Sequence, residues 1–218
     1  MAAQWWQDRL QGTSLGWLQD TSYNLIDHGL ICAFVERWHE ETCSFHLPFG
    51  EMTVTLDDVA CLLHLPIDGM LISHGSISRD EEVEWMVTYL GSDLGDALKV
   101  VEKTKGAHCR FGYMESIFKE RLKEQRDLVT EYGVTEEVRR LRDQCVRIYF
   151  LYLVRITIFT DKSQWVVDVV YMRYFRDLDL IVGYSWGAAT LAQLYRELNN
   201  DARCNYSQVA GYLTLLQV

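Results

Sequence analysis

The pattern of hydrophobic positions predicts helices over most of the chain. An apolar face recurs every three or four residues in 23–38, and again without a break from Val138 to Phe159. Further helices are predicted at 79–90, 112–127, 165–177, 186–199 and 206–217. Only two prolines occur, Pro48 and Pro66, and such scarcity favours long helices over a loop-rich β fold. The sequence therefore predicts a mainly α protein.

The hydrophobic period changes from helical to alternating between residues 43 and 55. The runs "CSFHL" and "MTVTL" are rich in β-forming residues and flank the loop Pro48–Glu51, which predicts an antiparallel hairpin. Thr55, followed by Asp58 three residues later, has the form of a helix N-terminal cap. We therefore expect a single compact helical domain over residues 1–218, with a small antiparallel β-hairpin near residues 43–55.

The charge of the chain argues against direct nucleic-acid binding. The formal net charge is −10, and residues 1–100 carry sixteen acidic side chains against four basic ones. An acidic surface repels phosphate. Residues 119–147 are rich in bases, but acids alternate with them, as on exposed helix faces. The run "LDDVACLLHLP" resembles the first half of a helix-turn-helix, yet acids follow it where a basic recognition helix belongs.

Cysteine usage and hydropathy favour a reduced, intracellular protein without a membrane span. The six cysteines form no C-x-x-C pair, and the first residues lack the pattern of a signal peptide. The most apolar run, Ile148 to Phe159, has twelve residues, whereas a bilayer needs about 20.

The stretch "GYSWG" (183–187) fits the G-x-S-x-G motif of the α/β-hydrolase nucleophile elbow. In that fold a histidine follows the serine, but every histidine of this chain precedes Ser185, at positions 28, 39, 46, 64, 74 and 108. We therefore interpret Ser185 as the N-cap of the helix that follows and predict no catalytic residue. A serine hydrolase using Ser185 remains a remote alternative.

A cluster of potential zinc ligands lies around the predicted hairpin, at His39, Cys43 and His46, with His64 or Cys61 as a fourth. The spacing is not that of a closed zinc site, and a pleated strand places Cys43 and His46 on opposite faces. We therefore predict neither a metal site nor a cofactor.

Adjacent tryptophans, Trp5 and Trp6, mark the amphipathic start of the chain. Tryptophan is enriched at the centres of protein interfaces. They are therefore the candidate partner-binding residues, and residues 1–22 the candidate docking arm.

A long run of the chain resembles the plant mobile domain of the MAINTENANCE OF MERISTEMS-like family. The run is "FVERWHEETCSFHLPFGEMTVTLDDVACLLHLPIDG" (34–69), and the later blocks 149–163, 184–198 and 210–217 agree with the same pattern. The chain departs from the family's usual form at three positions, where Glu40, Cys43 and His64 replace proline, histidine and glycine.

The resemblance implies a nuclear plant protein, active in transposable-element silencing, regulation of gene expression and meristem maintenance. We expect the domain to be a non-enzymatic interaction module. The resemblance also implies a serine/threonine phosphatase-like partner that carries a related domain, with hetero- or homo-association through this domain. A transposon-derived nucleic-acid-binding domain is the alternative.

Overall fold

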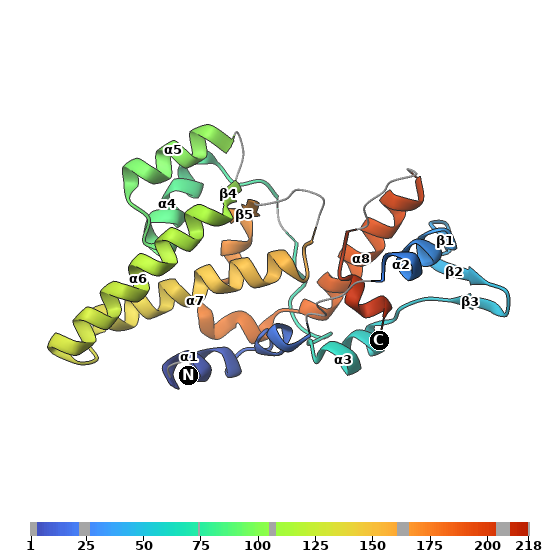
Figure 1. Cartoon of the computed structure of the whole chain (residues 1–218), viewed down its shortest axis with the longest axis horizontal. Coiled ribbons are helices and arrows are strands. Elements are labelled where there is room, and N and C mark those ends of the chain that lie inside the picture. The colour runs from blue at the N-terminus through green and yellow to red at the C-terminus, as the bar shows by residue number, and fades with distance from the viewer. Residues whose placement is uncertain are drawn as a thin grey trace. The chain divides into compact units, whose positions relative to one another are not determined.

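The structure is a computed structural model that describes residues 4–21, 27–73, 75–104, 108–160, 166–203 and 210–217. Helices dominate, and the strands form two small antiparallel sheets (Figure 1). The mainly α fold with a small antiparallel hairpin predicted from the sequence is therefore confirmed.

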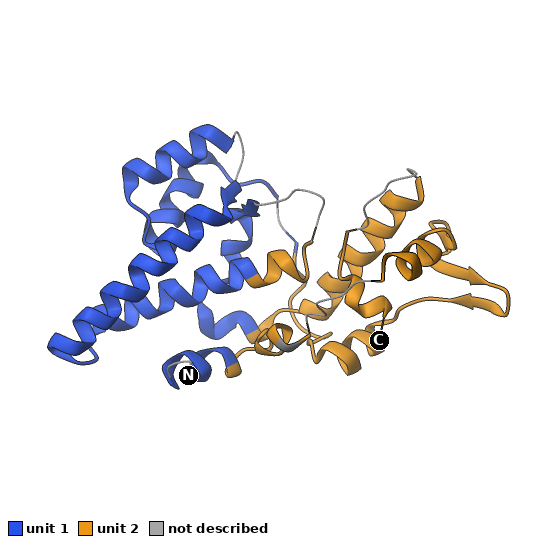
Figure 2. Ribbon diagram, viewed as in Figure 1, with its two compact units in different colours: residues 1–10, 73–152, 165–181 blue, residues 11–72, 153–164, 182–218 orange. Residues whose placement is uncertain are grey.

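Residue contacts divide the chain into two compact units, each assembled from three separate segments (Figure 2). Unit 1 comprises residues 1–10, 73–152 and 165–181, and unit 2 comprises residues 11–72, 153–164 and 182–218. Because the segments alternate along the chain, neither unit is a continuous stretch of sequence. One domain over 1–218 stays a prediction.

Unit 1 is built around a helical hairpin. Its elements are α1 (Gln4–Gln11), α4 (Arg79–Leu90), α5 (Leu94–Thr104), β4 (His108–Arg110), α6 (Phe111–Tyr132), α7 (Glu136–Ile156, of which residues up to 152 belong here), β5 (Val166–Asp168) and the 3₁₀ helices η2 (Val169–Tyr174) and η3 (Leu178–Gly183, up to 181). Gly133, with φ +75, ends α6, and Thr135 accepts a hydrogen bond from the backbone N–H of Val138 as α7 begins. The buried rings of Phe150 and Phe175 stack in the core, with centroids 5.7 Å apart.

Unit 2 packs a three-stranded sheet against a long helix. Its elements are η1 (Gly16–Asp20), α2 (His28–Val35), β1 (Trp38–His39), β2 (Ser44–Leu47), β3 (Gly50–Met52), α3 (Leu56–Leu63), the last turn of α7, α8 (Trp186–Arg203) and η4 (Leu213–Leu216). The strand order is β1-β2-β3, antiparallel throughout. The Trp38 ring lies between Phe45 and Tyr195, and its indole N–H donates to the side-chain oxygen of Asn199 over 2.6 Å. Buried aromatic contacts therefore hold the sheet on α8.

Most predicted helices are confirmed, with shifted ends. The regions 79–90, 112–127 and 186–199 form α4, α6 and α8. Part of the predicted helix 23–38 forms α2, while residues 22–26 lie outside the described part of the chain. At the C-terminal end, the predicted helix 206–217 is described only from residue 210, where η4 is found.

The predicted helix over 165–177 is wrong. Val166–Asp168 forms strand β5, antiparallel to β4, and the Asp168 side chain then accepts a hydrogen bond from the N–H of Val170 to begin η2. Two adjacent valines favour a strand, and the aspartate starts a new turn immediately after it. A strand of three residues is too short to show the alternation of hydrophobic and polar residues by which strands are predicted from sequence.

The hairpin near residues 43–55 is shorter in its loop and larger in its sheet than predicted. Leu47 pairs with Gly50, so the loop has two residues, Pro48 and Phe49, instead of four. The additional strand β1 pairs with β2.

Candidate partner-binding surface

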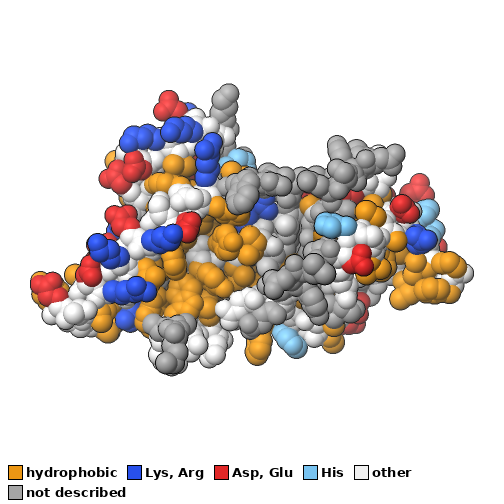
Figure 3. All heavy atoms as spheres, in the orientation of Figure 1, with side chains coloured by type: hydrophobic (Ala, Val, Ile, Leu, Met, Phe, Trp, Pro, Cys, Tyr) orange, Lys and Arg blue, Asp and Glu red, His pale blue; other side chains and the backbone are white. Residues whose placement is uncertain are grey.

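An apolar groove lies between α6 and α7 in unit 1. It has a volume of about 400 Å³, and the residues that line it are Phe111, Met114, Glu115, Phe118, Ile148, Tyr149 and Tyr152. On the face shown in Figure 3, hydrophobic side chains gather over these two helices, with charged side chains around them. Apolar clefts of this size are typical of sites that take a ligand or a side chain of a partner.

Helical spacing explains why these residues face one another. On α6, Phe111, Met114 and Phe118 follow each other at intervals of three and four residues. On α7, Ile148 and Tyr152 are four residues apart and so lie on one side of that helix. Both rows therefore form stripes along the groove.

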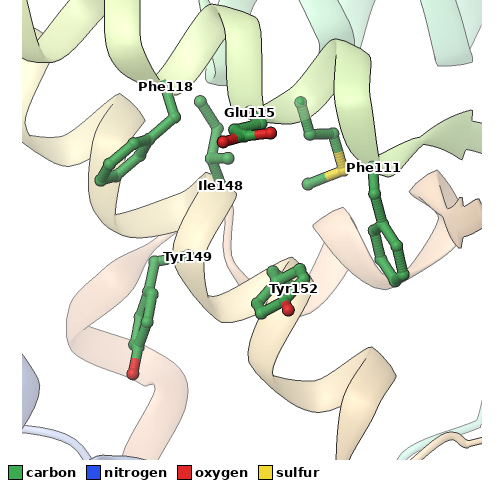
Figure 4. Close-up of a pocket in the computed structure, with 7 residues that line it drawn as sticks. Phe111, Glu115, Phe118, Ile148, Tyr149 and Tyr152 are labelled. Carbon is green, nitrogen blue, oxygen red and sulfur yellow. The ribbon is translucent and has the colours of Figure 1, made fainter. Parts of the chain in front are cut away.

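Aromatic rings form both ends of the groove (Figure 4). At one end, the Trp6 ring of α1 packs edge-to-face against Phe118 and Tyr149, with centroid distances of 5.9 and 5.1 Å. At the other end, Phe111 and Tyr152 meet edge-to-face at 5.1 Å. Edge-to-face contacts are a preferred arrangement of aromatic pairs, so they favour the ring positions that form the groove.

The base of the groove is apolar, and its one charged lining residue is an acid. Met114 and Ile148 are buried. The Glu115 carboxylate is exposed, and one of its oxygens lies 2.6 Å from the ammonium of Lys119 on the same helix. Exposed ion pairs contribute little stability, so this pair leaves the carboxylate able to interact with a second cation.

The two tryptophans predicted to bind a partner have different surroundings. Trp6 borders the groove, as described above. Trp5 contacts Trp6 edge-to-face at 5.5 Å, and the guanidinium carbon of Arg142 lies 4.9 Å from its ring centroid. The predicted arm of residues 1–22 forms α1 and η1 where it is described. A binding role for Trp5 and Trp6 stays a prediction, and the groove residues of α6 and α7 are a site that the sequence did not indicate.

Ser185 is buried, with 1% of its surface exposed, although its motif resembles an exposed nucleophile. It occupies the predicted N-cap position, because α8 begins at the next residue. Its hydroxyl donates to the carbonyl oxygen of Ile67 over 2.7 Å. In the described parts of the chain, no histidine or carboxylate is hydrogen-bonded to this hydroxyl, so the arrangement of a serine nucleophile and its base is not found there.

Two buried cysteines are poor nucleophiles. Burial raises the pKa of the Cys109 and Cys145 thiols to about 12. The reactive form of cysteine is the thiolate, and at neutral pH these two side chains stay protonated.

The histidine-rich hairpin forms an aromatic stack on the sheet. The rings of His39 and His46 are 3.6 Å apart and nearly parallel. The Cys43 thiol donates instead to the carbonyl oxygen of Glu40 over 3.4 Å. Within residues 4–217, excluding the segments that are not described, no group of three or more His, Cys, Asp or Glu side chains is arranged to hold a metal ion. None of the described helices is long and apolar enough to cross a membrane.

Comparison with known proteins identifies relatives over nearly the whole chain. The chain is 37% identical over 193 residues to Protein MAIN-LIKE 1 and 33% identical over 208 residues to Protein MAINTENANCE OF MERISTEMS, both from Arabidopsis thaliana. These matches cover 88% and 95% of this chain but 35% and 40% of the two relatives. No solved structure matches.

A phosphatase relative contains a similar region. The chain is 35% identical over 193 residues to the serine/threonine-protein phosphatase 7 long form homolog of Arabidopsis thaliana, covering 88% of this chain and 13% of that protein. The chain therefore spans less than half the length of each of these curated relatives.

The profile of the plant mobile domain matches residues 16–218. The groove residues of α6 and α7 lie inside this match, whereas Trp5 and Trp6 precede it. The resemblance seen in the sequence is confirmed, and this chain belongs to the plant mobile domain family.

Proposed function

We propose that the chain is a protein-interaction domain without catalytic activity of its own. It acts in the nucleus with a serine/threonine phosphatase-like partner, in transposable-element silencing, regulation of gene expression and meristem maintenance. The observation that carries this proposal is the aromatic groove of unit 1. Its rings, apolar base and single charged lining residue have the composition of an interface centre.

The similarity to a phosphatase relative supports the choice of partner. That protein contains a region 35% identical to this chain, and a name in the same family refers to the maintenance of meristems. Related domains in two proteins offer a direct way for them to associate. Burial of Ser185 and of the Cys109 and Cys145 thiols supports an interaction role over catalysis.

The experiment measures binding of the full chain to the phosphatase 7 long form homolog, with groove variants and matched controls. Tyr152→Ala removes a ring that lines the groove and Trp6→Ala one that packs against two lining rings, whereas Trp17→Ala and Tyr132→Ala remove exposed rings of the same kinds elsewhere. Loss of an aromatic anchor at an interface centre typically costs about 2 kcal/mol. We expect the groove variants to weaken binding at least tenfold, and the controls to leave it unchanged.

Two results would contradict the proposal. One is the absence of binding by the unsubstituted chain, and the other is equal binding by all four variants when circular dichroism shows them folded. The alternative is that the domain binds nucleic acid. In that case the chain should bind duplex DNA, and its affinity for the DNA should fall steeply as the salt concentration rises.

A further inference from the structure

The aromatic groove between α6 and α7 has features that indicate what kind of side chain it takes. Its volume, about 400 Å³, is at the lower end for ligand sites, which suits one long side chain and its adjacent backbone. Met114 and Ile148 offer an apolar base for the stem of such a side chain. Long stems with a charged end commonly lie along apolar surfaces in this way.

The end of the groove at Trp6 favours a cation. Trp6 meets Phe118 and Tyr149 edge-to-face, with its ring plane at 76° and 70° to theirs. Figure 4 shows Phe118 and Tyr149 on one side of the opening and Phe111 and Tyr152 toward the other. The face of an aromatic ring carries partial negative charge and attracts a cation within about 6 Å of its centroid.

The charge of the lining residues points the same way. Glu115 is the one charged side chain among the seven that line the groove, and it is an acid. Its pairing with Lys119 is exposed and lies along α6. A second cation in the groove would share the Glu115 carboxylate with Lys119 and would contact aromatic rings, whereas an acidic side chain would meet no basic residue among the seven that line it.

Unit 1 already binds cations of its own on aromatic faces. The guanidinium carbon of Arg142 lies 4.9 Å from the Trp5 centroid, and that of Arg147 lies 5.5 Å from the Tyr89 centroid. Of these two contacts, the Arg142–Trp5 pair lies next to Trp6, whereas Tyr89 is not part of the groove. Cation–π contacts are strongest with tryptophan.

We infer that the groove binds an ammonium group on an alkyl stem, namely a lysine side chain of the partner protein, and binds it more tightly when that lysine is methylated. This inference rests on the proposed interaction function and adds the chemistry of the side chain recognised. Methylation weakens the hydration of the ammonium but keeps its charge, so less hydration is lost when the group enters a ring of aromatic side chains.

The test uses short peptides with one variable side chain, titrated into the full chain. The probes are acetyl-Gly-Lys-Gly-amide, its trimethyl-lysine form and the neutral analogue in which carbon replaces the charged nitrogen. Methyl signals of Met114 and Ile148 in NMR spectra report occupancy of the groove. From the energy of cation–π contacts, we expect the trimethyl-lysine peptide to bind about fivefold more tightly than the neutral analogue.

Variants connect the effect to the groove. Tyr152→Ala and Glu115→Gln should each reduce the preference for the charged peptide, whereas Tyr132→Ala, on the same helix as Glu115 but outside the lining, should leave it unchanged. Unmethylated lysine should also bind more tightly than the neutral analogue. Equal or tighter binding of the neutral analogue, or no response of the groove methyl signals, would overturn the inference. Either result leaves the proposed function standing, because association with the phosphatase relative is measured separately.

Discussion

The hydroxyl of Ser185 donates a hydrogen bond to the carbonyl oxygen of Ile67 over 2.7 Å. The backbone continues the same connection, since the N–H of Gly187 donates to the carbonyl oxygen of Pro66 and the N–H of Ser185 donates to that of Met70. The motif that resembles a nucleophile elbow therefore attaches the start of α8 to the segment that follows α3. Its serine and glycines have a structural explanation within unit 2.

Replacing Ser185 by alanine should lower stability and should not abolish any catalysis. The variant leaves the partly buried Ile67 carbonyl without this donor, which typically costs about 1–2 kcal/mol. Urea denaturation measures the loss. Ser116→Ala is the control, because the Ser116 hydroxyl donates to a carbonyl on an exposed helix face, and we expect little change there. An esterase activity that disappears in Ser185→Ala would contradict this interpretation.

Gly69 is a position where a side chain cannot be accommodated. Its φ is +116, and a Cβ atom would lie 2.5 Å from the carbonyl oxygen of Gly183. Gly69→Ala should destabilise the chain by at least about 2 kcal/mol, because both backbone strain and a backbone clash oppose it. Gly112→Ala, within α6 and with no heavy atom near its Cβ, should instead stabilise by up to about 1 kcal/mol. The melting temperatures of the two variants should therefore shift in opposite directions from that of the unsubstituted chain.

Local signals in the sequence predicted where elements begin more reliably than which faces are buried. The Thr55–Asp58 capping box is present as predicted, and the apolar stripe that starts at Val138 lies in α7. The apolar face from Val138 to Phe159, however, includes Tyr152 and Ile156, and both are more than 40% exposed. Ile156 lies about five helical turns beyond the buried Val138 and therefore on the same side of the helix, so exposure along this stripe depends on which elements pack against each part of α7 and not on the spacing.

The groove could not be predicted because it depends on tertiary pairing. Phe111 and Tyr152 are 41 residues apart and come from different helices, and each fits an ordinary amphipathic pattern in its own helix. The spacing of Phe111 and Phe118 by seven residues was the available signal, and it is common to core stripes as well. Trp6 could be singled out from the sequence, but its contacts could not.

Replacing His64 by glycine should give a more stable chain than replacing it by alanine. It ends α3 in the left-handed conformation, with φ 53 and ψ 29, where glycine has no steric penalty. We expect His64→Gly to raise stability by about 1 kcal/mol relative to His64→Ala. Both variants lose the contact between the His64 and Trp17 rings, so the comparison isolates the backbone effect. Equal stability of the two variants in urea would show that the backbone at this position relaxes without cost.

Glu82 should make stability depend on pH. Its side chain is 1% exposed, and its Oε1 atom has no hydrogen-bond partner among the described residues. Burial, assisted by the charge of Asp168 and opposed by Arg79, raises the pKa of Glu82 to about 7. A carboxyl whose pKa is higher in the folded chain than in the unfolded chain binds its proton more tightly when folded. It therefore lowers stability as pH rises from about 4.5 to about 7, and the penalty stays constant above that.

The variant Glu82→Gln removes this penalty, because glutamine keeps the shape of the protonated side chain without its charge. We expect urea denaturation to show it more stable than the unsubstituted chain by about 1–2 kcal/mol at pH 8, with little difference at pH 4.5. Glu81→Gln is the control from the adjacent position. Hydrogen bonds from Ser78 lower the pKa of Glu81, so this carboxylate contributes stability that is lost on acidification, and its replacement should not stabilise at pH 8. A stability difference for Glu82→Gln that is the same at both pH values would mean that Glu82 is not desolvated in the folded chain.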